Sequence, residues 1–183
     1  QLPPWQRFSP KKDYRKVLTT KPHQSHPNYV FHLGNEIWAT RCLQRDAICL
    51  TNPSKRIDIG GAYIHDGVLF GDTLYFTRVD GHVVTADVKT LSVKNEYDLN
   101  QWTSGNKKLG WCRGIKVLDE HTVIVGFTRA RPTNNPLDGN HANIMQGETL
   151  PTRIACYDLK QGRILWECDL EPYHFNVVFS IHC

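Results

Sequence analysis

The chain has 183 residues, of which 40% are hydrophobic, with 22 basic and 18 acidic residues and a formal net charge of +4. This length permits one domain with a buried core, and so mild a charge favours neither nucleic acid nor a membrane surface as a partner. No apolar run is long enough to span a bilayer, and the six cysteines contain no CxxC pair. We therefore expect a reduced, cytoplasmic protein with no cofactor and no bound metal.

The N-terminal segment, residues 1–28, carries five of the ten prolines and a charged middle, KKDYRKVLTTK. This composition predicts an extended arm. From residue 29 to residue 183, short strands dominate, and they fall into three groups at about 29–59, 60–100 and 110–171.

The second group shows the strand pattern most clearly. Its alternating apolar strands are separated by Gly71-Asp72 and by Asp80-Gly81, and the second pair is a strong hairpin signal. Four strands in about 45 residues is the size of one propeller blade. The sequence therefore predicts an all-β fold, a propeller-like array of four-stranded antiparallel blades.

Two segments near the C-terminus stand apart from this pattern. A long polar insertion, residues 131–150, interrupts the third group, and insertions of this length in a compact repeat are usually functional or mobile. It contains possible ligands for a hard cation, but these lack the full series of a calcium-binding loop: Asp138, Asn140, His141 and Asn143. The final segment, PYHFNVVFSIHC, predicts one last strand.

A Thr-Arg pair ends an apolar strand in each of the three groups: LGNEIWATR, FGDTLYFTR and DEHTVIVGFTR. The arginines are Arg41, Arg78 and Arg129, spaced 37 and 51 residues apart, which is the period of a supersecondary unit. Equivalent positions in a propeller lie at equal radius, so the three side chains can ring one opening and bind a carboxylate, phosphate or sulfate. Alternatively, each arginine pairs with an Asp of a neighbouring blade or covers the core with its stem.

Histidines mark the beginnings of two groups. His26 with Asn28, and His65 with Asp66, can act as a general base and its orienting partner at one end of the domain. Histidines in solvent-facing loops are the alternative interpretation. Arg113 follows Trp111-Cys112 and places a cation beside an aromatic surface, although a tight turn with a packed Trp explains the same pattern.

The segment YDLKQGRILWECDL resembles the repeat of quinoprotein-type β-propellers through Asp158, Gly162 and Trp166. A longer stretch resembles the C-terminal part of an uncharacterised family of bacterial propeller-like proteins, in the words HPNYVFHLGNEIWATR, IHDGVLFGDTLYFTR, WCRGIKVLDEHTVIVGFTRAR and LPTRIACYDLKQGRILWECDL. The resemblance implies a propeller and no particular activity, and chains of that family are nearly twice as long. Because three blades fall short of the usual minimum of four, we expect self-association or a missing chain segment to complete the ring.

Two functions fit these patterns. The first is a binding protein that recognises an anionic small molecule or a peptide segment at the blade ends, through Arg41, Arg78, Arg113 and Arg129 with Asn28 and Asp66. The second is an enzyme, a lyase, hydrolase or isomerase, in which His26 or His65 moves a proton and the arginines stabilise a developing anion. Propellers host both functions, so the fold cannot choose between them. Arginines that point to separate surfaces would instead leave a structural or protein-interaction role.

Overall fold

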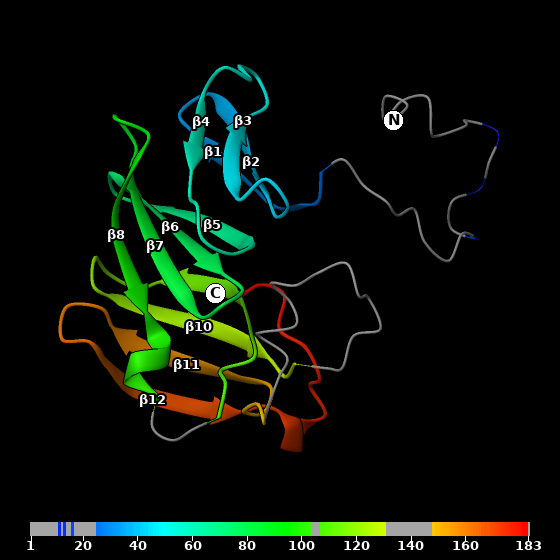
Figure 1. Ribbon diagram of the computed structural model, residues 1–183, viewed down its shortest axis with the longest axis vertical. Helices are drawn as coiled ribbons and strands as arrows, with labels where there is room; N and C mark the ends of the chain where they lie inside the picture. The colour runs from blue at the N-terminus through cyan, green and yellow to red at the C-terminus, as the bar shows by residue number, and fades with distance from the viewer. Residues whose placement is uncertain are drawn as a thin grey trace.

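The protein forms three four-stranded antiparallel sheets, which lie one below another along the long axis of the molecule in Figure 1. The computed structural model describes residues 25–103, 107–130 and 148–182, together with residues 11, 13 and 16. In each sheet the strands follow one another in chain order. We call the sheets blade 1, blade 2 and blade 3.

Twelve strands and two short 3-10 helices make up these blades. Blade 1 contains β1 (Pro27–Leu33), β2 (Glu36–Arg41), β3 (Asp46–Cys49) and β4 (Arg56–Asp58). Blade 2 contains β5 (Ile64–Phe70), β6 (Thr73–Arg78), β7 (His82–Asp87) and β8 (Ser92–Asp98), followed by the helix η2 (Leu99–Trp102). Blade 3 contains β9 (Trp111–Val117), β10 (Thr122–Thr128), β11 (Arg153–Asp158) and β12 (Arg163–Asp169), followed by η3 (Glu171–Tyr173).

The first strand of each blade is its inner strand. β1 contacts β5, and β5 contacts β9, so the three inner strands lie side by side while the last strand of each blade lies at the periphery. The last strands of blades 2 and 3 are correspondingly the most exposed. This radial arrangement around a row of inner strands is that of a propeller.

Two hydrophobic cores hold the blades together. The core between blades 1 and 2 is built around Trp38 and Phe76, both fully buried, with the Phe31 ring stacked on Trp38 at 6.2 Å. The core between blades 2 and 3 is built around Phe127 and Tyr157, whose rings meet edge to face. Period-2 alternation produces this packing, because it places alternate residues of one strand on opposite faces of the blade.

The predicted fold class, an all-β propeller-like array of four-stranded blades, is confirmed. Most of the predicted arm, residues 1–28, and most of the polar insertion lie outside the described residues. The final segment differs from the prediction, because residues 174–182 belong to no sheet. Among the described residues, no helix has the length and apolar character needed to cross a bilayer.

Candidate functional site

The threonine of each Thr-Arg pair, rather than the arginine, links one blade to the next segment of chain. The Thr40 hydroxyl accepts from the backbone N–H of Tyr29 in its own blade (3.0 Å) and donates to the carbonyl of His65 in blade 2 (2.6 Å). Thr77 does the same one blade later, accepting from the Asp66 N–H at 3.1 Å and donating to the Arg113 carbonyl of blade 3. Both threonines are fully buried.

Thr128, the third such threonine, contacts the C-terminal segment instead of a fourth blade. Its hydroxyl donates to the Val178 carbonyl at 3.2 Å and accepts from the Val178 N–H at 3.0 Å. The Thr152 hydroxyl donates to the Asn176 carbonyl at 3.2 Å. On blade 3, the Val178 carbonyl thus accepts the threonine hydrogen bond that carbonyls of the inner strands β5 and β9 accept on blades 1 and 2. We call residues 176–182 the tail, and the surface of blade 3 beneath it the seat.

Two glycines give the seat its depth. A Cβ on Gly126 would lie 2.4 Å from a methyl carbon of Val178, and one on Gly114 would lie 2.9 Å from the Cα of Ser180. Val178 is itself 8% exposed. Arg113 lies over the Phe179 ring, 4.9 Å from its centroid, and this distance permits a cation–π contact. The tail therefore binds through its backbone, one buried aliphatic side chain and one aromatic ring.

The three repeated arginines form ion pairs with acids. Arg41 makes a two-pronged contact with the fully buried Asp46 in the adjacent strand, at 2.8 and 2.6 Å. Arg129 makes the same kind of contact with Glu171, which also accepts from the Thr152 N–H at 2.9 Å. These backbone and guanidinium contacts lower the pKa of Glu171. The acids come from the same blade, or from the segment following it, and not from a neighbouring blade.

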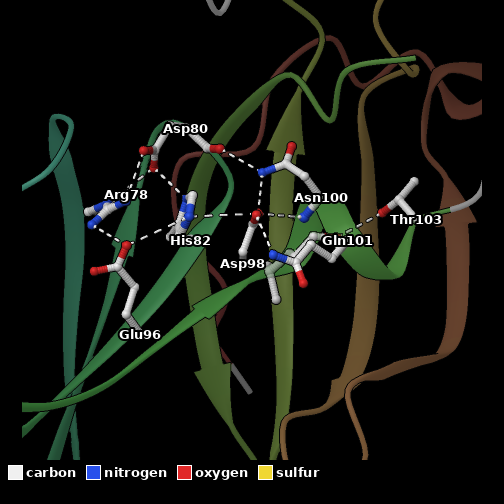
Figure 2. A network of polar contacts seen from close by, with 9 residues as sticks. Arg78, Asp80, His82, Glu96, Asp98, Asn100, Gln101 and Thr103 are labelled. Atoms are coloured by element: carbon white, nitrogen blue, oxygen red, sulfur yellow. Dashed lines mark hydrogen bonds and ion pairs between the residues drawn. The ribbon is translucent and has the colours of Figure 1, made fainter. Parts of the chain in front are cut away.

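Arg78 is buried in a polar network on the face of blade 2 that faces blade 1 (Figure 2). Its guanidinium lies 3.0 Å from Asp80 and 2.9 Å from Glu96. Gly61, which has a positive φ of 61°, lies against this guanidinium so closely that a Cβ there would be 2.2 Å from a guanidinium nitrogen. The connection between blades 1 and 2 thus covers Arg78. The positive charge of Arg78 is compensated by the carboxylates of Asp80 and Glu96.

His82 joins the same network. Its Nδ1 lies 3.1 Å from Asp80, and its Nε2 lies 3.7 Å from both Glu96 and Asp98. Burial disfavours the protonated imidazole, but the Asp80 carboxylate outweighs this effect, so the pKa of His82 is raised. Burial likewise acts against the charge of Asp80, yet His82 and Arg78 lower the pKa of its carboxyl. The folded network therefore favours the protonated form of His82.

This arrangement predicts a pH dependence of stability. Because the pKa of His82 is raised on folding, its contribution is complete below about pH 6.5, the usual value, and is lost as the pH rises through the folded-state pKa. We expect the urea midpoint of the protein to fall between pH 6 and pH 8, and His82→Gln to remove much of that fall. His121→Gln, at an exposed turn, serves as the control and should retain it. If the urea midpoint fell equally with pH in the unaltered protein and in His82→Gln, the attribution of this pH dependence to His82 would be contradicted.

The second predicted pair, His65 and Asp66, is close and buried. His65 Nδ1 lies 2.7 Å from the Asp66 carboxylate, and the Asp66 N–H is held by Thr77. Both residues lie within β5 rather than before it. Asn28, within β1, donates to the Ile64 carbonyl at 3.0 Å and so links blades 1 and 2. His26 is exposed, and its carbonyl accepts from the Cys42 N–H.

The predicted site residues are therefore brought together only in part. His65, Asp66 and Asn28 lie along the adjoining inner strands β1 and β5, whereas Arg41, Arg78 and Arg129 are each directed to an acid. The possible cation ligands of the insertion, Asp138 to Asn143, lie outside the described residues. Within the described part of the chain, no group of three or more His, Cys, Asp or Glu side chains is placed to hold a metal ion.

Sequence reasoning missed Arg153, which is the most deeply enclosed arginine of blade 3. It is 2% exposed, donates to the Leu109 carbonyl at 2.8 Å and lies 4.4 Å from the centroid of the Phe127 ring. Burial lowers its pKa. Arg153 pairs in register with Phe127, whereas Asp46 and His82 pair with Arg41 and Arg78, so the repeat pattern gave no signal for it.

Comparison with known proteins supports the fold. No protein-family model matches the sequence, and no curated protein matches it either. Among solved structures, the chain is similar to the WD40 β-propeller domain of Doa1, with 13% identity and a TM-score of 0.52 over 86% of this chain and 43% of that chain. It also aligns with the computationally designed proteins Ika4 (12% identity, TM-score 0.48, 82% of this chain and 77% of that one) and Ika8 (12%, 0.47, 78% and 36%).

The likeness to the Doa1 domain shows the architecture alone. The chain is a β-propeller-like array that spans less than half of the length of the Doa1 domain chain. The resemblance to quinoprotein-type repeats and to a bacterial family stays a prediction.

Proposed function

We propose that the protein is a polypeptide-binding propeller module, and that its binding surface is the seat on blade 3. The observation that carries this proposal is the tail itself, a segment outside any sheet. Thr128 binds both the backbone N–H and the carbonyl of Val178 in this segment. Main-chain contacts supply affinity in such recognition, and a side-chain pocket supplies specificity. Here the pocket is the space above Gly126, which accepts Val178.

The surroundings of the tail suit further protein contacts. Three aromatic side chains beside or within it are more than half exposed: Tyr173 (66%), Phe175 (57%) and Phe179 (59%). Exposed aromatic surface of this kind is enriched where proteins meet. We therefore assign an apolar, aromatic-containing polypeptide segment as the binding partner, of the same chemical type as the tail.

Recognition of a small anion has less support. Arg41, Arg78 and Arg129 are already paired with carboxylates, so an anion would have to displace Asp46, Asp80 or Glu171. The enzyme hypothesis needs arginines beside His65, and these three are directed to their acids instead. A reaction at the His65–Asp66 pair stays a prediction.

The proposal is tested by emptying the seat without shortening the chain. Val178→Asp places a charge in the apolar pocket and should release the tail, since an unpaired buried charge is strongly unfavourable. We expect a fluorescently labelled peptide with the sequence of residues 175–182, FNVVFSIH, to bind this variant. Binding would be measured as an increase in the fluorescence anisotropy of the peptide.

Two controls separate binding at the seat from non-specific adhesion. In the double variant Val178→Asp, Gly126→Leu, the new side chain fills the pocket, and we expect peptide binding to weaken at least tenfold. A peptide carrying Asp in place of its second valine should also fail to bind the single variant. Equal binding to both protein variants, or no binding to either, would contradict the proposed function.

A further inference from the structure

A groove separates blades 2 and 3 at the end of the strands opposite to the Thr-Arg pairs. Its volume is about 330 Å³. One wall is the face of blade 2 that carries Tyr75, Asn95 and Tyr97, and the other is the β9–β10 turn at Glu120. This volume falls in the range of small-ligand sites, and the groove shares no lining residue with the seat.

The walls of the groove are fixed in place. The Tyr75 hydroxyl donates to the Glu120 carbonyl at 3.0 Å and so ties the turn of blade 3 to blade 2. Asp119 accepts from the backbone N–H groups of His121 and Thr122, both at 2.8 Å, and these bonds lower its pKa. Because the turn is braced internally by Asp119 and tied to blade 2 by Tyr75, the groove is preformed.

The polar groups in the groove include donors and acceptors that the fold does not use. Lys94 and Glu120 are exposed, and within the described part of the chain neither the ammonium nor the carboxylate has a hydrogen-bonding partner. Asn95 donates to Thr85 at 3.4 Å and keeps its amide oxygen as an acceptor. Asp72 also lines the groove, but Lys89 lies 3.4 Å from its carboxylate and balances its charge. Because the remaining charged pair, Lys94 and Glu120, carries opposite charges on facing walls, the groove has no strong preference for an anion or a cation.

Aromatic rings supply the remaining surface. Tyr97, which is partly buried, lies on the blade 2 wall, and Phe70, which is 36% exposed, lines the same groove. Tyr75 is only 3% exposed, so its main contribution is to hold the Glu120 turn through its hydroxyl. Burial raises the pKa of both tyrosines, so their hydroxyls stay protonated at neutral pH. Ring faces bear partial negative charge and attract weakly polarised C–H groups.

We propose that this groove binds a neutral saccharide residue. A pyranose ring presents C–H groups that can rest on the aromatic side chains, and each of its hydroxyls both donates and accepts, as the mixed set of Lys94, Asn95 and Glu120 requires. A hydroxyl between Lys94 and Glu120 accepts from the ammonium and donates to the carboxylate. This site is distinct from the polypeptide seat and adds a second binding activity to the module.

The test uses the full chain and four sugars: glucose, galactose, mannose and N-acetylglucosamine. We expect saturation-transfer NMR to detect at least one of them, with a dissociation constant in the millimolar range. Lys94→Met and Glu120→Gln should each weaken binding about tenfold, because each removes a hydrogen bond to a charged group. Lys160→Met, at an exposed turn of blade 3, should leave it unchanged.

Three outcomes would overturn the saccharide site. The first is the absence of saturation transfer from all four sugars, and the second is transfer that Lys94→Met and Glu120→Gln leave intact. The third is binding of methylguanidinium or of inorganic phosphate in preference to every sugar, since either result would assign a charged ligand. Because both substitutions are at exposed positions, we expect the two variants to fold normally, which an unchanged circular dichroism spectrum would verify.

Discussion

Trp38→Ala should lower the free energy of unfolding by about 3–5 kcal/mol, the usual cost of emptying a large aromatic site in a core. Trp38 is fully buried between blades 1 and 2 and stacks on Phe31. Because single domains are typically stable by only about 5–15 kcal/mol, the variant should be close to unfolding at 37 °C. Urea denaturation followed by circular dichroism measures the change without relying on tryptophan fluorescence.

Trp166 provides the matched control for this substitution. It lies on the peripheral strand β12 and is 44% exposed, so Trp166→Ala should cost less than about 1 kcal/mol. Similar losses for the two variants would show that the inter-blade core does not dominate stability. In that case the packing of blade 1 on blade 2 would have to be reconsidered.

Asp46→Ala should destabilise the protein by about 2–4 kcal/mol. The carboxylate is fully buried and holds Arg41, with Arg56 at 3.2 Å on its other side. Removal of one member of a buried ion pair leaves the other charge without compensation. Since both arginine side chains reach solvent, we place the expected loss below that of a fully enclosed pair.

Asp58→Ala is the corresponding exposed change. Asp58 also contacts Arg56 at 3.2 Å, but its side chain is 69% exposed, and its removal should cost less than about 0.5 kcal/mol. If Asp46→Ala proved as mild as Asp58→Ala, Arg41 would not depend on its acid. The arginine would then be available to bind an external anion, contrary to the structural role inferred here.

Local patterns in the sequence were sufficient to predict an all-β fold of four-stranded antiparallel blades. Alternation of apolar and polar residues marks the strands, and pairs such as Asp80-Gly81 mark their turns, because both depend on neighbouring residues alone. The recurrence of Thr-Arg also indicated that Arg41, Arg78 and Arg129 have equivalent places. The acid opposite Arg41 was within reach of the same reasoning, since Asp46 follows it across one tight turn.

The roles within the site could not be read in the same way. Thr77 binds the Arg113 carbonyl across 36 residues, and Thr128 binds Val178 across 50, and no local pattern specifies such contacts. The alternation of apolar residues in the tail predicted a strand. Within the described residues, however, the tail pairs with no strand, and threonine hydroxyls bind its backbone instead. The groove between blades 2 and 3 likewise depends on the relative placement of two blades, which no local sequence pattern specifies.

Amide hydrogen exchange at Val178 tests most directly whether blade 3 holds the tail as the other blades hold an inner strand. We predict that this amide exchanges at least tenfold more slowly than an exposed amide in the intact protein, because it donates to Thr128 in a buried position. Thr128→Val should remove that protection while leaving the amides of β6 protected. Exchange of the Val178 amide at the rate of an exposed amide in the unaltered protein would contradict the seat and the function built on it.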